Sequence, residues 1–304
     1  MLTVAEATSI LAIGSRTYPG GKNSCYQHII NQIPPHRVYI EPFLGSGAIM
    51  RLKLPASINI GVDLDDSVLP GSLAVNGDVC RRVSADIATN GDAGHNFPDP
   101  IATINDAGLT AVPSAMTMGA PIANNGDASC KYLFIQANAL DFLSSCRFRG
   151  DEFIYLDPPY LRSVRKSKRA LYRHEFWTKE DHSRLLSLVR SLPCMVAISG
   201  YGSELYQDRL SHWRLVTFQA HTRNGMATEC LWMNYDQPET LHDYRFLGAD
   251  FRERERIKRK AKRWVKRFLE LDLLERHAII SELNYAGVIA KNDVTAVLEE
   301  SCTP

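Results

Sequence analysis

The stretch RVYIEPFLGSGAIMRLKL (residues 37–54) has the pattern of a strand, a glycine loop and a helix. A second strand-like stretch, SINIGVDLDD (57–66), follows it and ends in acidic residues. Strand-like and helical segments continue to alternate as far as residue 200. This alternation predicts an α/β fold in which a mostly parallel, Rossmann-like sheet has helices on both faces.

Four later apolar runs predict further strands: FIYL (153–156), MVAIS (195–199), WRLVTFQA (213–220) and ECLWMNY (229–235). Only the short polar turn HTRNG (221–225) separates the last two runs, which predicts an antiparallel hairpin at one edge of the sheet. Helices are predicted to begin at Asn23 or Ser24 and at Thr178, each of which is a residue type that caps helices.

Residues 70–130 interrupt the alternating pattern. This segment is rich in Ala, Gly, Asn, Asp and Pro, and the triplet NGD occurs in it three times. Because Asn-Gly pairs favour turns, we expect an insertion made of small hairpins or of a mobile loop. The predicted organisation is a catalytic domain formed by residues 1–69 and 131–236, the insertion at 70–130, and a basic helical tail at 237–304.

The composition is that of a globular protein. The chain has 304 residues, of which 45% are hydrophobic and 23% are charged. No apolar run reaches the roughly 18 residues that a membrane helix requires, and the start lacks the basic region of a secretory signal. Seven cysteines without a CxxC pair argue against a zinc ribbon or a disulfide framework. We therefore expect a cytoplasmic protein with no metal site and no membrane association.

The net charge of +1 hides a local asymmetry. Residues 245–267 contain eleven Lys and Arg against three acids, and residues 161–174 contain six Lys and Arg and no acid. Residues 70–130 contain two Arg and six Asp. Basic blocks of this kind are what a polyanion would contact, although a solvated basic helix is the structural alternative.

The glycine loop indicates a ligand at the carboxyl edge of the sheet. Gly45 and Gly47 allow close approach of the backbone, and Asp63 and Asp65 end the next strand, where an acid can bind ribose hydroxyls. The loop has no phosphate-binding lysine, and Glu41 would repel a phosphate. A cationic ligand that contains adenosine, such as S-adenosylmethionine, fits this pattern better, while a purely structural bend is the alternative.

The stretch LDPPY (156–160) directly follows a predicted strand and therefore lies at the same edge. Its prolines stiffen the corner, which would hold the Asp157 carboxylate and the Pro158 carbonyl as two neighbouring acceptors, with the Tyr160 ring beside them. Two acceptors suit an exocyclic amino group, and the ring suits a stacked base. The corner is thus predicted to receive a nucleobase taken out of a helix and to promote direct methyl transfer to its amino group.

Four motifs occur in a specific order: YPGGK (18–22), EPFLGSG (41–47), ALDF (139–142) and LDPPY (156–160). Together they resemble the Dam-like, alpha-group adenine-N6 DNA methyltransferases of bacteria and phages, over about residues 14–66 and 131–236. The resemblance implies Asp157, Pro158 and Tyr160 as the catalytic and base-stacking set. It implies a cofactor site for S-adenosylmethionine made of Tyr18, Lys22, Glu41, Phe43, Gly45, Gly47, Asp63, Asp141 and Phe142. Gly200 replaces an Asn that often follows Ser199 in the family, which leaves the role of Ser199 open.

The resemblance also implies double-stranded DNA as the partner. The family's target-recognition segment corresponds to residues 70–130, which are poor in the Lys and Arg that contact phosphates. We therefore predict DNA contacts elsewhere, at Arg162, Arg165, Lys166, Lys168, Arg169, Arg223 and Asn224. The basic tail is a further candidate.

Two alternatives remain open from the sequence. The same chemistry would serve a cytosine-N4 or RNA methyltransferase, although cytosine-specific members more often carry Ser in place of Asp157. A non-catalytic DNA-binding relative is the second alternative, and the intact DPPY corner argues against it. The recognition sequence, a restriction partner and the choice between monomer and dimer are left open.

Overall fold

The computed structural model describes residues 20–69, 129–165, 173–174, 176, 178–222 and 225–286, together with short strands between 74 and 84 and at 122–123. The chain divides into two compact units, and the boundary lies between Tyr244 and Arg245. Four short strands and the first two residues of a longer strand, Ser129 and Cys130, lie within the predicted insertion, and the rest of that insertion lies outside the described residues.

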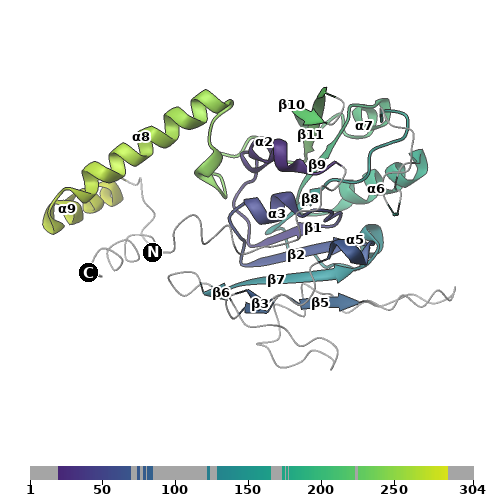
Figure 1. The fold of residues 1–304 in the computed structure, drawn as a ribbon, viewed down its shortest axis with the longest axis horizontal. Helices are drawn as coiled ribbons and strands as arrows, with labels where there is room; N and C mark the ends of the chain where they lie inside the picture. Colours follow the sequence, from purple (N-terminus) through teal and green to yellow (C-terminus); the bar gives the residue numbers. More distant parts are fainter. Residues whose placement is uncertain are drawn as a thin grey trace. The chain divides into compact units, whose positions relative to one another are not determined.

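The first unit is built on a nine-stranded sheet with the order β10-β11-β9-β8-β1-β2-β7-β5, in which β6 also pairs with β7 (Figure 1). A separate two-stranded sheet pairs β3 with β4. The strands are β1 (Val38–Glu41), β2 (Ile58–Asp63), β3 (Ala74–Val75), β4 (Asp78–Val79), β5 (Arg81–Ser84), β6 (Ile122–Ala123), β7 (Ser129–Gln136), β8 (Glu152–Leu156), β9 (Met195–Gly200), β10 (Arg214–Thr222) and β11 (Gly225–Met233).

Six neighbouring strands, from β9 to β5, are parallel to one another. The outer pair β10 and β11 forms an antiparallel hairpin, and β11 joins the rest of the sheet by antiparallel pairing with β9. The predicted mostly parallel α/β sheet with an edge hairpin is confirmed. Parallel strands need long crossover connections, and the helices provide them.

Helices cover both faces of the sheet because alternate strand residues point to opposite sides. Val38 and Ile40 of β1 share one apolar core with residues of α5, α6 and α7. Tyr39 and Glu41 face the other side, where the backbone N–H of Met50 in α3 donates to Glu41. The helices of this unit are η2 (Lys22–Ser24), α2 (Tyr26–Ile30), α3 (Ala48–Leu52), η3 (Asp66–Val68), α5 (Ala139–Ser145), α6 (Lys179–Ser191) and α7 (Glu204–Arg209).

Two predicted helix starts can be compared with the structure. Thr178 is the N-cap of α6, where its hydroxyl and the Asp181 side chain form a reciprocal capping box. The segment that begins near Asn23 starts instead as the 3-10 turn η2 and continues as the short helix α2.

The second unit contains helices α8 (Phe251–Leu269) and α9 (Leu273–Tyr285), and η4 (Tyr244–Phe246) spans the boundary between the units. The tail was predicted to be helical from residue 237. Residues 237–243 are not helical and belong to the first unit instead. There the Asp243 carboxylate accepts from the backbone N–H of Leu54, and the backbone N–H of His242 donates to the Ile33 carbonyl. No helix in the described part of the chain is long and apolar enough to span a membrane.

Candidate active site

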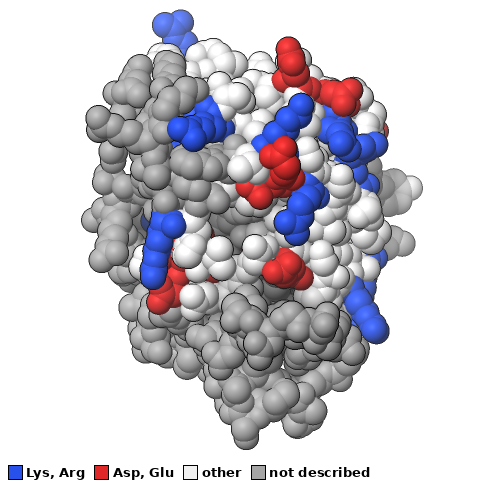
Figure 2. All heavy atoms as spheres, turned by 90° about the vertical axis from the view of Figure 1, so that its right-hand side faces the viewer, with Lys and Arg blue, Asp and Glu red and all other residues white. Residues whose placement is uncertain are grey.

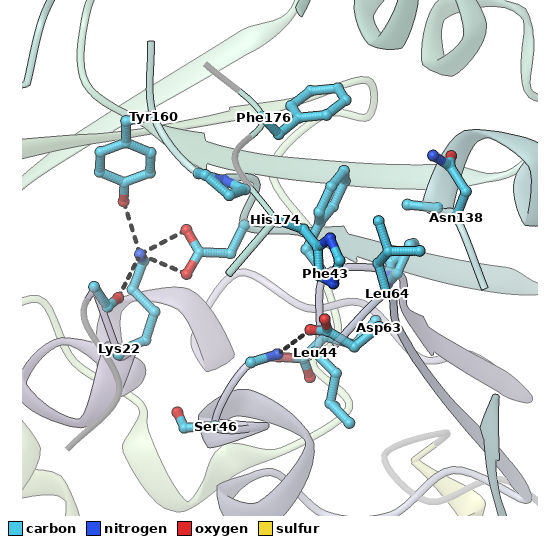
Figure 3. Close-up of a pocket in the computed structure, with 18 of the residues that line it drawn as sticks. Lys22, Phe43, Leu44, Ser46, Asp63, Leu64, Asn138, Tyr160, His174 and Phe176 are labelled. Atoms are coloured by element: carbon cyan, nitrogen blue, oxygen red, sulfur yellow. Dashed lines mark hydrogen bonds and ion pairs between the residues drawn. The ribbon is translucent and has the colours of Figure 1, made fainter. Parts of the chain in front are cut away.

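A pocket of about 230 Å³ lies where β1, β2 and β8 end. Figure 3 shows Lys22 and Tyr160 at one end of this pocket and Asp63, Leu64 and Asn138 at the other. Its lining includes the predicted residues Lys22, Glu41, Phe43, Gly45, Asp63, Asp157 and Tyr160. The fold thus brings together the glycine loop and the DPPY corner, which are more than a hundred residues apart in the sequence.

The glycine loop is bound to the end of β2. The φ angles of Gly45 and Gly47 are 48° and 58°, a left-handed conformation that residues with a side chain rarely adopt. The backbone N–H of Leu44 donates to the Val62 carbonyl at 3.0 Å, and that of Gly45 donates to Asp63 Oδ2 at 2.8 Å. The glycines are therefore required for the turn that carries the loop past the Asp63 carboxylate.

Asp63 is positioned by backbone groups on both oxygens. Oδ1 accepts from the backbone N–H of Asp65 at 2.9 Å, and Oδ2 accepts from Gly45. Burial raises the pKa of Asp63, and these two backbone hydrogen bonds act in the opposite direction. A carboxylate has about four lone-pair sites, so two bonds leave Asp63 free to accept hydrogen bonds from a ligand.

Lys22 lies in the DPPY corner. Its Nζ lies 2.7 Å from both carboxylate oxygens of Asp157 and 2.7 Å from the Tyr160 hydroxyl, and it also donates to the Gly20 carbonyl. The Lys22 side chain is only 4% exposed. Burial lowers the pKa of Lys22, but the Asp157 and Glu229 carboxylates outweigh burial, and the net pKa is raised above its ordinary value. Lys22 is thus a buried, permanently protonated partner of Asp157.

Ser199 contacts the Asp157 carboxylate, even though Gly200 follows it. The parallel register pairs Leu156 with Ile198, which places Ser199 opposite Asp157. The Ser199 hydroxyl donates to Asp157 Oδ1 at 2.9 Å and lies 3.0 Å from the Tyr155 hydroxyl. Ser199 therefore helps to hold the carboxylate, a contact that the family pattern alone left open.

Glu229 is a site residue that sequence reasoning missed. It lies in β11, is buried, and its Oε2 accepts from the Tyr160 hydroxyl at 2.7 Å. Burial raises the pKa of Glu229, while the nearby Lys22 ammonium lowers it. The sequence offered one signal for Glu229, a single acid at the start of the otherwise apolar run ECLWM. Its partner, Tyr160, follows a different strand, so the contact is not visible in the sequence.

Glu41 is also buried, at the end of β1. Its Oε2 accepts from the Tyr39 hydroxyl at 2.9 Å and from the backbone N–H of Met50 at 3.1 Å. Burial raises the pKa of Glu41 to about 8, although both of these bonds favour the ionised form. A cationic group in the pocket would favour ionisation of this carboxyl further.

His182 supports the proline corner from α6. Its Nε2 lies 3.1 Å from the Pro159 carbonyl and 3.0 Å from that of Phe176, and its Nδ1 lies 2.7 Å from the Tyr206 hydroxyl. Burial lowers the pKa of His182 to about 4, so the ring is neutral at physiological pH. A neutral ring that donates from Nε2 to the carbonyls must accept from Tyr206 at Nδ1.

Four predicted residues do not line the pocket: Gly47, Asp141, Phe142 and Pro158. Phe142 is buried in the core, and Asp141, its neighbour in α5, is exposed. Asn138, Ala139 and Leu140 line the pocket in their place. The Asn138 side chain caps α5 by accepting from the backbone N–H of Leu140, and this cap sets which face of the helix meets the pocket.

The predicted DNA-contacting residues are only partly described. Arg162 is exposed and lines a second cleft of about 840 Å³, together with Lys179 and Gln207. Arg165 is only 6% exposed, so its side chain is not available on the surface. Six predicted site residues lie outside the described part of the chain: Tyr18, Lys166, Lys168, Arg169, Arg223 and Asn224.

Figure 2 shows the face of the molecule toward which the arrows of β5 and β7 point in Figure 1. On the described part of this face, Lys and Arg side chains are interspersed with Asp and Glu. Near the end of β2, the Arg173 guanidinium lies 3.3 Å from Asp65 and 2.9 Å from Asp66. The described residues therefore do not form a uniformly basic surface here.

Comparison with known proteins gives one family. Residues 18–59 and 134–226 match the model of the D12 class N6 adenine-specific DNA methyltransferases. No curated protein matches the chain significantly.

Similar solved structures include a putative methyltransferase, yhhF, from Escherichia coli, with 12% identity, a TM-score of 0.30, and coverage of 66% of this chain and 76% of that one. Magnesium protoporphyrin IX methyltransferase from Synechocystis, solved with bound SAM, has 8% identity, a TM-score of 0.33, and coverage of 70% and 76%. TrmK from M. capricolum, in complex with S-adenosyl-homocysteine, has 8% identity, a TM-score of 0.34, and coverage of 86% and 94%. Similarities of this size carry no information about ligand or substrate.

Proposed function

We propose that this chain, of which residues 18–59 and 134–226 match the D12 class of N6 adenine-specific DNA methyltransferases, uses its pocket to transfer a methyl group from S-adenosylmethionine to adenine N6 in double-stranded DNA. One observation carries the proposal. The Asp157–Tyr160 corner and the Asp63 carboxylate beside the glycine loop line a single pocket of about 230 Å³. A methyl donor and a methyl acceptor can therefore meet in it.

The chemistry of the pocket fits S-adenosylmethionine, which supplies an electrophilic methyl group when bound. Asp63 offers free acceptor sites for ribose hydroxyls, and Glu41 offers a carboxylate for a positive charge. The rings of Phe43 and Phe176, whose centroids are 5.3 Å apart, give an apolar wall for a planar base. Asp141 is exposed and does not line the pocket, and it stays a proposed cofactor contact on the strength of the family resemblance.

We predict that affinity for S-adenosylmethionine rises with pH up to about 8. Burial raises the pKa of Glu41 to about 8, so at lower pH a cation must displace a proton when it binds beside this carboxyl. Linkage then strengthens binding by up to about tenfold per pH unit between about pH 6 and 8. Calorimetry on the wild type and on Glu41→Gln measures this slope. In the Glu41→Gln variant the carboxyl no longer titrates, and only the amino group of S-adenosylmethionine still does. Equal pH slopes in both proteins would therefore contradict the proposed role of Glu41.

Asp157 is the group that would accept an N–H hydrogen bond from the target amino group. In the structure, both of its oxygens accept from Lys22, so the incoming amino group must take the place of one of these contacts. The hydrogen bond to Asp157 directs the nitrogen lone pair away from the carboxylate and toward the methyl donor. The nitrogen then releases one proton. Lys22 cannot accept it because its pKa is raised, which leaves Asp157 as the base within reach.

The burial of this corner supports extrusion of the base from the duplex. The Asp157 side chain is 18% exposed and lies beside the buried Lys22. A base inside the helix cannot reach such a carboxylate, and enzymes that act on bases solve this by flipping them out of the stack. Tyr160 is the aromatic ring at this point, and it packs edge-on against Tyr201 with centroids 4.6 Å apart.

Glu229 is a positioning residue in this proposal, since it orients the Tyr160 ring through its hydroxyl. We expect Glu229→Ala to raise KM for DNA about tenfold with a smaller change in kcat, because a lost hydrogen bond of about 1–2 kcal/mol would affect base binding first. Glu229→Gln retains an oxygen acceptor for the hydroxyl and should restore most of the KM. Steady-state kinetics on both variants, with cofactor affinity as the control, test this. A Gln variant as impaired as the Ala variant would reject the orienting role.

Two described cations, Arg162 and Lys179, line the second cleft. Arg162 follows the DPPY corner by two residues, and Lys179 is the first residue of α6. We propose that they contact phosphates next to the extruded base. Lys166, Lys168, Arg169, Arg223 and Asn224 remain proposed DNA contacts. A cytoplasmic location and a monomeric or dimeric state also remain proposals.

Mass spectrometry of nucleosides tests the function directly. The full chain is incubated with labelled S-adenosylmethionine and unmethylated duplex DNA, and the digested product is analysed. We expect N6-methyladenine, and sequencing of the methylated DNA then gives the recognition site. Label in N4-methylcytosine, or label in RNA but not in DNA, would identify one of the alternative substrates. No label in any of them would leave only the non-catalytic alternative.

A further inference from the structure

Helix α8 carries a row of arginines on one face. Its 19 residues contain ten Lys and Arg against two Glu. Arg252, Arg256, Arg259 and Arg263 follow one another at spacings of four, three and four, which puts them on one side of a helix. Because the rise is about 1.5 Å per residue, the row is about 16 Å long.

The arginine row is distinct from the helix's apolar side. Ile257, Ala261, Trp264 and Phe268 recur at the same helical spacing but lie on the opposite face from the row. No residue of α8 is buried. Arg256, Arg259 and Arg263 line an open hollow of about 510 Å³ on the surface of this helix. The row therefore presents a concentrated positive surface to whatever approaches it.

Few of these charges are neutralised by residues in the described part of the chain. The described ion pairs join Arg256 to Glu253 at 3.4 Å, Lys258 to Glu255 at 3.9 Å, and Lys266 to Glu270 at 3.7 Å. In the part of the chain that the structure describes, no acid pairs with Arg252, Lys260, Lys262 or the two central arginines of the row, Arg259 and Arg263.

The placement of these cations is unfavourable for the isolated helix. Like charges three and four residues apart repel one another, and cations near a helix N-terminus oppose the helix dipole. The helix starts nonetheless because Asp250 caps it, accepting from the backbone N–H of Glu253 at 2.8 Å. A row that costs stability in the free protein indicates a polyanionic partner, which would remove the repulsion.

We propose that the arginine row of α8, formed by Arg252, Arg256, Arg259 and Arg263, binds the phosphate backbone of duplex DNA as a contact separate from the catalytic pocket. The proposal rests on the function proposed above, which already brings DNA to this chain. Charge complementarity supports it, because duplex DNA carries about one negative charge per 1.7 Å of axis and its major groove admits an α-helix. An anionic membrane would instead select a broad apolar face, whereas Arg254 and Lys258 flank the apolar side of α8.

Two matched variants of the full chain test the row. In the first, all four arginines are replaced by Gln, which keeps helix propensity but removes four charges. In the second, all four are replaced by Lys, which keeps the charges. Binding to a short labelled duplex is measured by fluorescence anisotropy between about 50 and 200 mM salt. Calorimetry with S-adenosylmethionine shows that each variant retains its folded catalytic unit.

We expect the Gln variant to bind the duplex at least about tenfold more weakly, and its slope of log K against log salt to be shallower by about 3 to 4, at about 0.9 per lost phosphate contact. The Lys variant should keep the wild-type slope. An unchanged affinity and slope in the Gln variant would overturn the inference. It would also be overturned if the wild type bound anionic lipid vesicles instead of DNA, or if the Gln variant differed only in oligomeric mass. Because binding is measured without methyl transfer, a wild type that binds through this row but methylates no DNA would count against the proposed function alone.

Discussion

Replacement of Asp157 by Ala should lower the rate of methyl transfer by about 10²- to 10⁴-fold while cofactor affinity stays within a few-fold of the wild type. Asp157 is the carboxylate that the proline corner aims into the pocket, and Lys22 and Ser199 hold it there. Without it, the target amino group loses the acceptor that directs its lone pair. Cofactor binding relies on Asp63 and Glu41 at other strand ends, so it should persist.

Single-turnover kinetics with labelled cofactor, together with calorimetry, measure these two quantities. Asp151→Asn is a suitable control because Asp151 lies at the other end of the same strand, where it pairs with Arg37 on the surface. That variant should retain wild-type kinetics. Full activity in Asp157→Ala would contradict the proposed mechanism, whereas loss of cofactor binding would show that Asp157 shapes the whole pocket.

Replacement of Lys22 by Met should lower the free energy of unfolding by about 3–5 kcal/mol near pH 8. Lys22 is the cation that faces the partly buried Asp157 carboxylate and the buried Glu229 carboxylate, and its removal takes away the positive partner that the described residues give them. The loss should be smaller near pH 5. Without the ammonium that lowers it, the pKa of Glu229 rises further. A carboxyl whose pKa is raised in the folded state destabilises the fold increasingly as pH rises above its unfolded-state pKa, and fully only above its folded-state pKa.

Urea unfolding at the two pH values measures the effect. The double variant Lys22→Met, Glu229→Gln should recover part of the stability, since it removes one of the two unpaired charges, and the resulting double-mutant cycle gives the coupling energy. Equal losses at both pH values, or no recovery in the double variant, would show that Lys22 contributes through packing and not through charge.

The fold followed from local patterns. Alternating strand and helix segments predicted the parallel sheet, and the short polar turn HTRNG predicted the edge hairpin, because both depend on residues that are close in the sequence. The two site motifs were also visible, since the glycines of the loop and the prolines of the corner restrict the backbone where they stand. Their meeting in one pocket followed from the rule that parallel strands end at a common edge.

The sequence did not predict in the same way which residues of helix α5 face the pocket. The resemblance of ALDF implied Asp141 and Phe142 as cofactor contacts, but Ala139 and Leu140 line the pocket, whereas Phe142 is buried in the core and Asp141 is exposed. Neighbouring helical residues differ by about 100° in direction, so a motif read as a linear string does not say which member faces a ligand.

Residue order alone was therefore enough to predict the fold class and to place the glycine loop and the DPPY corner, because each depends on short-range backbone preferences. The surroundings of Asp157 emerged only from the folded chain. Lys22 lies 135 positions away from Asp157, and Glu229 lies 69 positions from Tyr160. Such neighbours are set by strand order and register, which depend on how the whole sheet packs and not on any single segment.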